Sequence, residues 1–144
     1  DEWKVRWEAC RGLAKLGAAA VPHLPEVLAL AETEKDGDVR DEAKRALAEV
    51  HQAATADDLR RLVAEAAGCL ASESFKTRRN ACFLLGMLAD LAMAHMPAVE
   101  RLKGEDDLMV RRAARNAYRE LSMARARFRE AHPDRAEGED AGLG

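Results

Sequence analysis

Apolar residues recur along this chain at intervals of three and four, the spacing at which one face of an α-helix repeats. A first helix is predicted from about Asp1 to Gly17, and it carries two apolar stripes on well-separated sides. One stripe is Val5, Ala9, Leu13 and Leu16, and the other is Trp3, Trp7, Cys10 and Ala14. A lone surface helix needs one such stripe. Two stripes predict a helix inside a stack, with one face for a partner helix and one for a neighbouring repeat.

The same spacing predicts six further helices. They are expected over about residues 21–33, 38–53, 56–71, 74–92, 95–102 and 107–131. Pro22 and Pro97 stand in first turns, where proline is tolerated because those N–H groups have no intrahelical acceptor. The helix over 74–92 is apolar on nearly every side and is expected in the middle of the stack. Residues 132–144 have no apolar period, so we expect an acidic tail that is disordered or draped on a partner.

One phrase occurs four times: an acid, then Val-Arg, then Ala four residues after the Val. It is complete at Val39-Arg40, and it begins at positions 5, 39, 77 and 110, so the intervals are 34, 38 and 33 residues. The third copy is weaker because Thr77 replaces the Val. A period of this size is typical of stacked helical repeats. We therefore predict an all-α, right-handed α-solenoid of about three and a half helix-pair repeats over residues 1–131, with repeats starting near 1, 36, 73 and 106.

These features resemble HEAT repeats of the armadillo-like helical class, in the short form also seen in the phycobilisome-lyase-like group. The resemblance covers roughly residues 1 to 125 and implies a curved surface of parallel helices that binds other proteins. In that family the acid and the arginine of successive repeats commonly pair along the stack. The resemblance implies this ladder role for Arg6, Arg40, Arg78, Arg111, Asp36 and Asp106.

Composition changes this picture little. Net charge is −3, so no charge imbalance points to nucleic acid or an anionic membrane. The most apolar stretch, Leu84 to Ala94, is interrupted by Asp90 and is too short to cross a bilayer, so no membrane insertion is expected. The chain opens on Asp-Glu-Trp without Met or a signal-peptide pattern, which favours a processed chain or a piece of a longer one.

The residues that commonly carry chemistry are scattered. No histidine pair has zinc-ligand spacing, none of the four histidines is followed by Glu, and there is no phosphate-binding glycine loop or GxSxG. The cysteines, Cys10, Cys69 and Cys82, form no CxxC pair and are predicted to be small buried hydrophobes in a reducing intracellular compartment. We therefore expect no catalytic residues, no cofactor and no metal site.

Two surfaces are candidates for partner binding. The stripe with Trp3 and Trp7 packs on the next repeat, or it faces a preceding repeat or partner. The last helix is rich in arginine, and its candidates are Arg112, Arg115, Arg119 and Arg125. That helix also lacks the partner helix that would complete its repeat. Three interpretations of its basic side are open. It is a solvated face with salt links to neighbours, a binding site for an acidic partner or for the chain's own acidic tail, or a surface that binds the phosphates of a nucleic acid.

The function predicted from these features is binding without catalysis. The chain is expected to be a scaffold or an accessory subunit, with other protein subunits of a larger complex as partners. One alternative is a lyase-like or chaperone-like protein that handles a chromophore or a client subunit, which requires a reactive Cys or His facing a groove. Another is nucleic-acid backbone binding through the last helix, which the slightly acidic net charge and the scarcity of aromatic residues disfavour.

Overall fold

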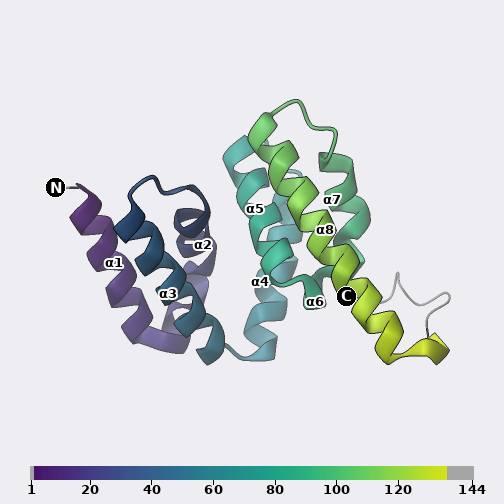
Figure 1. Cartoon of the computed structure of the whole chain (residues 1–144), viewed down its shortest axis with the longest axis horizontal. Coiled ribbons are helices and arrows are strands. Elements are labelled where there is room, and N and C mark those ends of the chain that lie inside the picture. Colours follow the sequence, from purple (N-terminus) through teal and green to yellow (C-terminus); the bar gives the residue numbers. More distant parts are fainter. Residues whose placement is uncertain (1, 136–144) are drawn as a thin grey trace. The chain divides into compact units, whose positions relative to one another are not determined.

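The computed structural model describes residues 2–135, and over this range all regular secondary structure is helical, which confirms the all-α prediction (Figure 1). Asp1, the predicted start of the first helix, and most of the predicted acidic tail lie outside the described residues. The α-helices are α1 (Glu2–Leu16), α2 (Leu24–Thr33), α3 (Gly37–Ala53), α4 (Ala56–Cys69), α5 (Phe75–Met87), α6 (Ala89–Ala92), α7 (Met96–Leu102) and α8 (Leu108–Ala131). Three 3-10 segments join them: η1 (Gly17–His23), η2 (Met93–His95) and η3 (Pro133–Arg135).

Two predicted helices are divided in the structure. The helix expected over 74–92 breaks at Leu88, whose φ of −102° and ψ of 35° leave the helical region, so α5 is followed by the four-residue α6. The helix expected from residue 21 begins as the 3-10 segment η1. Gly17, at the start of η1, has a φ of +55°, a conformation that glycine adopts without strain. It ends α1 and turns the chain toward α2.

The three helices α3, α5 and α8, which carry copies of the repeated phrase, begin with the same capping contact. The backbone N–H of Val39 donates to Oδ1 of Asp36 at 3.0 Å, and that of Val110 donates to Oδ1 of Asp107 at 3.0 Å. The cap of α5 is Ser74, whose Oγ accepts from the N–H of Thr77. Such caps satisfy N–H groups that have no partner in the first turn. In each case the cap stands three residues before the Val or Thr of the repeated phrase, so the start of the helix follows the repeat.

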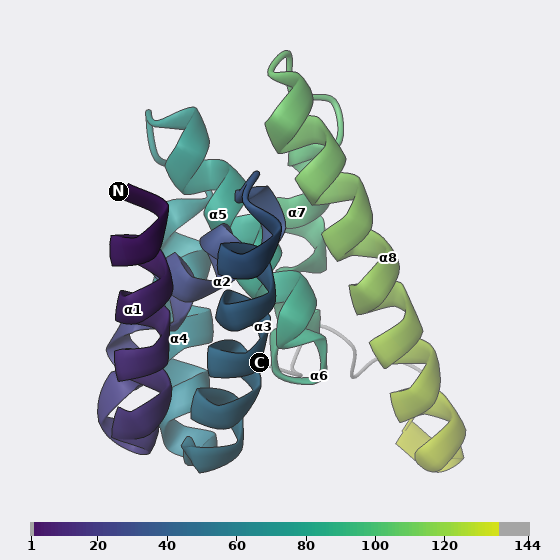
Figure 2. The ribbon, with the colours of Figure 1, turned by 60° about the vertical axis from the view of Figure 1, so that its left-hand side comes forward.

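The chain divides into two compact units, Asp1–Leu59 and Arg60–Gly144, and α4 runs across the division. In the first unit α3 packs on both α1 and α2, and Figures 1 and 2 show α1 and α3 side by side. Its core contains Cys10, Ala14, Val27, Ala31, Ala43 and Ala46. In the second unit α8 packs on α5, α6 and α7. Each unit therefore has one helix that packs on several earlier ones: two in the first unit and three in the second.

Four positions of the repeated phrase form the buried face of α3 and α8. In α3 and α8 none of these side chains is more than 3% exposed. They are Val39, Ala43, Ala46 and Val50 in α3, and Val110, Ala114, Ala117 and Leu121 in α8. The small residues permit close packing. A Cβ added to Gly86 of α5 would lie 3.2 Å from Cα of Ala117, so α5 and α8 are in backbone contact there.

The same face is exposed on α1, which corrects the expectation that the Val5 stripe packs inside the stack. Val5 is 69% exposed and Leu16 58% exposed, and Ala9 is exposed between them. The other stripe turns inward, with Cys10 fully buried. The physical reason is the packed neighbours: α3 packs on both α1 and α2, and α8 packs on α5, α6 and α7, whereas no described helix packs on this outer face of α1.

Within the described residues, one helical stretch, Glu2–Thr33, is long and apolar enough by length and composition to cross a membrane. Its most apolar 18-residue window has a mean hydropathy of 1.2, and 33% of that window is buried inside the chain. The sequence analysis had singled out Leu84 to Ala94 instead, a region that meets the criterion only across a bend of 108°. This is weak evidence for a membrane span, because packed core helices meet the same criterion, and Val27 and Leu28 of the stretch are core residues.

Candidate functional site

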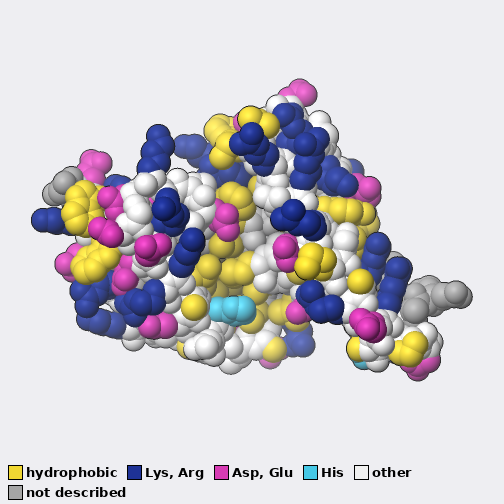
Figure 3. All heavy atoms as spheres, viewed as in Figure 1, with side chains coloured by type: hydrophobic (Ala, Val, Ile, Leu, Met, Phe, Trp, Pro, Cys, Tyr) yellow, Lys and Arg dark blue, Asp and Glu magenta, His cyan; other side chains and the backbone are white. Residues whose placement is uncertain are grey.

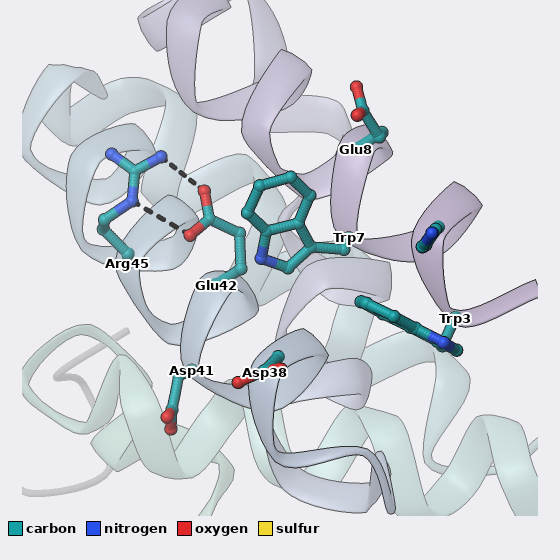
Figure 4. A pocket seen from close by; sticks show the side chains of 8 residues that line it. Trp3, Trp7, Glu8, Asp38, Asp41, Glu42 and Arg45 are labelled. Atoms are coloured by element: carbon teal, nitrogen blue, oxygen red, sulfur yellow. Dashed lines mark hydrogen bonds and ion pairs between the residues drawn. The ribbon is translucent and has the colours of Figure 1, made fainter.

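A groove in the first unit brings the two tryptophans beside acidic residues of α3 (Figure 4). Its volume is about 680 Å³, and its lining residues are Trp3, Lys4, Trp7, Glu8, Asp38, Asp41, Glu42 and Arg45. Trp3 and Trp7 are half-buried and stand one turn apart, on the side of α1 that also carries the fully buried Cys10. Both tryptophans thus lie on the side of α1 next to α3, and each ring keeps part of its surface exposed.

Basic side chains contact the two indole rings. The guanidinium of Arg11 lies 4.8 Å from the centre of the Trp7 ring, and the ammonium of Lys4 lies 5.7 Å from that of Trp3. These distances are within the range of cation–π attraction. Each indole ring is therefore already in contact with one cationic side chain of this chain, and the rest of its exposed surface lines the groove.

One carboxylate of the groove is neutralised within the protein. Arg45 donates from Nη2 to Oε1 of Glu42 at 2.5 Å and from Nε to Oε2 at 3.3 Å, which Figure 4 shows as a double contact. These hydrogen bonds hold the pKa of Glu42 below its ordinary value, and Arg45 also pairs with Glu49 at 2.7 Å. Glu42 is thus a structural residue that fixes one wall of the groove.

The remaining carboxylates of the groove have no such partner. Asp38 and Asp41 on α3 and Glu8 on α1 are exposed, and the described part of the chain offers them no hydrogen bond or ion pair. The site therefore combines open indole surface with unneutralised negative charge. Sequence reasoning identified the tryptophans and missed these acids. The repeat period carried the signal, because 34 residues after Trp7 is Asp41, on the helix that lies alongside.

The arginine ladder exists within each unit but uses different acids from those expected. Arg6 donates to both carboxylate oxygens of Glu34, at 2.8 and 3.0 Å, and Nη1 of Arg40 donates to the backbone oxygen of Glu34 at 3.2 Å. In the second unit Arg78 donates to Oε1 of Glu105 at 2.6 Å. Arg111 donates to the backbone oxygen of Glu105 at 3.0 Å. One glutamate therefore serves two arginines in each unit.

These contacts correct the predicted roles of Asp36 and Asp106. Asp36 caps α3 instead of pairing with an arginine, and only the backbone oxygen of Asp106 accepts from Arg111, at 3.4 Å. The position five residues before the Val holds the pairing acid, and the position three residues before it holds the cap. Aligning the copies on Val-Arg would have separated the two roles, since Glu34 and Glu105 then share one column.

Three of the four predicted binding arginines lie in one line on α8. Arg112, Arg115 and Arg119 recur at intervals of three and four and are exposed, and no hydrogen bond or ion pair joins them to other described residues. Figure 3 shows Lys and Arg side chains gathered over the first half of this helix. Arg125 is half-buried and stands off this line. The salt link to a neighbour that the sequence suggested is made by Arg127, which pairs with Asp90 at 3.0 Å.

The three cysteines are free thiols, and two of them, Cys10 and Cys82, are buried as the sequence analysis expected. Cys10 and Cys82 are fully buried, and Cys69 is half-buried. Burial raises the pKa of the Cys82 thiol to about 12 and also raises that of Cys10, so neither forms a nucleophilic thiolate readily. In the part of the chain that the structure describes, no three His, Cys, Asp or Glu side chains gather as metal ligands do.

The structure thus offers an acidic tryptophan groove on the first unit and an arginine line on the second. Neither surface includes a histidine or a cysteine. No family model matches the sequence, no curated protein is similar to it, and no solved structure matches its fold.

Proposed function

We propose that this chain is a non-catalytic scaffold or accessory subunit that binds a basic segment of a partner protein in the Trp3/Trp7 groove. One observation carries the proposal: two half-exposed indoles lie beside carboxylates that the chain leaves unpaired. A lysine or arginine side chain gains from both, by cation–π attraction to the ring and by Coulomb attraction to Asp38 and Asp41.

The architecture in this proposal is a right-handed α-solenoid of HEAT-like repeats. Its support is the repetition of three local devices at one register: the cap of the first helix, the glutamate that serves two arginines, and the four-residue buried face. A repeat protein builds its binding surface from side chains on successive repeats. The groove has this character, since α1 and α3 each supply one wall.

A scaffold accounts for the groove better than chromophore or client chemistry does. Its lining contains no Cys or His, the groups that could attack or hold a chromophore. The two cysteines whose pKa is raised belong to the core, away from a solvent-exposed wall. Binding by charge and aromatic contact needs neither.

Tryptophan fluorescence tests the proposal directly, because the chain's two tryptophans are the ones in the groove. Titration with an amidated Lys/Arg hexapeptide is expected to change the emission, and an acidic hexapeptide should not. D38N/D41N is expected to weaken the interaction roughly tenfold, the scale of two modest charge contacts. The matched control is D106N/E130Q, which removes two exposed carboxylates elsewhere. Equal affinity of the wild type for both peptides would refute the proposal.

The arginine line supports a second candidate function, binding to a phosphate polymer. Arg112, Arg115 and Arg119 offer three adjacent cations that the described chain does not neutralise. If this surface follows a nucleic-acid backbone, affinity for duplex DNA falls steeply with salt and is abolished by R112E/R115E/R119E. R60E/R61E on α4 is the control for basic charge elsewhere. Retention of DNA binding by the triple variant would remove this candidate.

A further inference from the structure

The outer face of α1 is a second surface, distinct from the groove. It consists of Val5, Ala9, Gly12 and Leu16, one side of the helix over three turns. Val5 and Leu16 are the most exposed large apolar side chains of the described chain, at 69% and 58%. Between them Ala9 is exposed, and a Cβ added to Gly12 would meet nothing within 4 Å. The centre of the face is therefore flat and open to close approach.

The repeats themselves indicate what covers such a face. At the same register α3 carries Val39, Ala43, Ala46 and Val50, all buried, with α2 packed on this helix. The corresponding face of α8 is also buried, with Ala117 against Gly86 of α5 and with α7 packed on the same helix. In each case the helix that precedes along the chain, α2 or α7, is joined by a short turn and runs antiparallel to the helix on which it packs. On α3 and α8 the face is therefore buried by other helices, and the occupant that fits α1 is a helix with a small, apolar stripe.

The charges beside the face select which helix that is. Glu8 and Lys15 flank it on the same side of α1, and neither is joined to another described residue by an ion pair. In an antiparallel pair of two α1 helices, Val5 lies opposite Leu16 of the second copy and Ala9 opposite Gly12. This register brings Glu8 beside Lys15 of the second copy, and two-fold symmetry repeats the pair. The small central residues allow the two backbones to approach closely.

We propose that α1 pairs with α1 of a second copy of this chain, forming an antiparallel two-fold dimer through Val5, Ala9, Gly12 and Leu16. The proposal does not depend on the function of the tryptophan groove, which uses another side of the helix. One helix pair buries less surface than the roughly 1,200 Å² of a standard stable interface, so the dimer dissociates on dilution. Burial of the apolar stripe supplies the attraction, and the reciprocal Glu8–Lys15 pairs fix the direction.

Sedimentation equilibrium of the whole chain over a range of concentrations is the first test. The mass is expected to rise from 15.8 kDa toward twice that value. V5D/L16D should remain a monomer with unchanged helicity and an unchanged peptide response of the tryptophans. The control M109D/M123D alters equally large exposed side chains on α8 and should dimerise like the wild type. A wild type that stays monomeric throughout, or a control that dissociates as fully as V5D/L16D, overturns the proposal.

A charge exchange tests the antiparallel register. E8K alone brings two lysines together at both ends of the helix pair, and K15E alone brings two glutamates together there, so each variant is expected to be monomeric. An equimolar mixture restores both attractive pairs and should form the heterodimer. Failure of the mixture to associate, or undiminished dimerisation of either variant alone, overturns the register. Because Glu8 also borders the groove, the independence of the two surfaces is judged on V5D/L16D.

Discussion

Glu34 links three parts of the first unit through one side chain and its own backbone. Its carboxylate accepts two hydrogen bonds from Arg6, its Oε1 also accepts from the backbone N–H of Asp36 at 3.2 Å, and its carbonyl accepts from Arg40. The side chain is only 8% exposed. These contacts, with the Arg6 hydrogen bond as the largest contribution, hold the pKa of Glu34 below its ordinary value of 4.5.

The lowered pKa of Glu34 makes part of the stability of this unit dependent on pH. A carboxylate with a lowered folded-state pKa stabilises the fold fully above its unfolded pKa, and this contribution is lost as pH falls through the folded value. E34Q is therefore expected to lower the urea midpoint at pH 7, and the difference from wild type should shrink as pH falls below about 4.5. The exposed, unpaired Glu32 supplies the control E32Q. A difference that stays constant down to about pH 2 would contradict this account.

The thiols provide a second prediction at the level of residues. Because Cys10 and Cys82 are fully buried with raised pKa values, an aromatic disulfide reagent at about pH 8 should label only Cys69 in the folded chain. All three should react in denaturant. C69S should abolish the fast reaction, whereas fast labelling of a C69S chain would show that a core thiol is accessible.

At the scale of elements, periodicity predicted the helices well because the apolar spacing is local. It missed the break at Leu88, since residues 84 to 94 are apolar except for Asp90 and no Pro or cluster of polar residues marks the start of a new helix. It also treated the Val5 stripe like the Val39 stripe, although burial depends on which helix packs there. Glu34 and Asp36 are both acidic and lie two residues apart, so residue type does not show which of them pairs with an arginine and which caps the helix. Only an alignment of the repeats distinguishes the two roles. The right-handed solenoid stays a prediction.

Two helical glycines distinguish packing from helix propensity. Replacing glycine by alanine inside a helix gains roughly 0.5–1 kcal/mol when the added methyl is unhindered. Gly68 in α4 has nothing within 4 Å of an added Cβ, so G68A should gain this amount. At Gly86 the added Cβ lies 3.2 Å from Cα of Ala117, so G86A should gain less, and G86L should lose roughly 1–3 kcal/mol by overpacking. Urea unfolding followed by circular dichroism measures all three, and equal effects of G86A and G68A would contradict a close α5–α8 contact.

At the scale of the whole molecule, the division into two units has a spectroscopic signature. Both tryptophans belong to the first unit, so their emission reports that unit, whereas far-ultraviolet dichroism reports all the helices. When most contacts are made inside each unit, unfolding need not be a single transition.

We therefore expect V39A in the first core to move the fluorescence midpoint by more than the dichroism midpoint. V110A in the second core should do the reverse, since its helix carries no tryptophan. Removal of these buried methyl groups costs roughly 1–3 kcal/mol, which is large enough to separate the curves. Coincident fluorescence and dichroism curves for both variants would show instead that the chain unfolds as one cooperative unit.

The glutamate that serves two arginines also determines where this chain can be cut and rejoined. The carboxylate of Glu34 accepts from Arg6 of α1, and its backbone carbonyl accepts from Arg40 of α3. A fragment exchanged at the start of α3 would therefore separate Glu34 from the arginine on α3. A segment from Glu34 to Gly104 begins with the acid that Arg6 uses, and the segment after it begins with Glu105, the acid that Arg78 uses, 71 positions later (105 − 34). If segments are joined at these two glutamates, each of the four arginines still has a glutamate to donate to. Glu34 and Glu105 are therefore suitable junctions for building longer chains from this sequence.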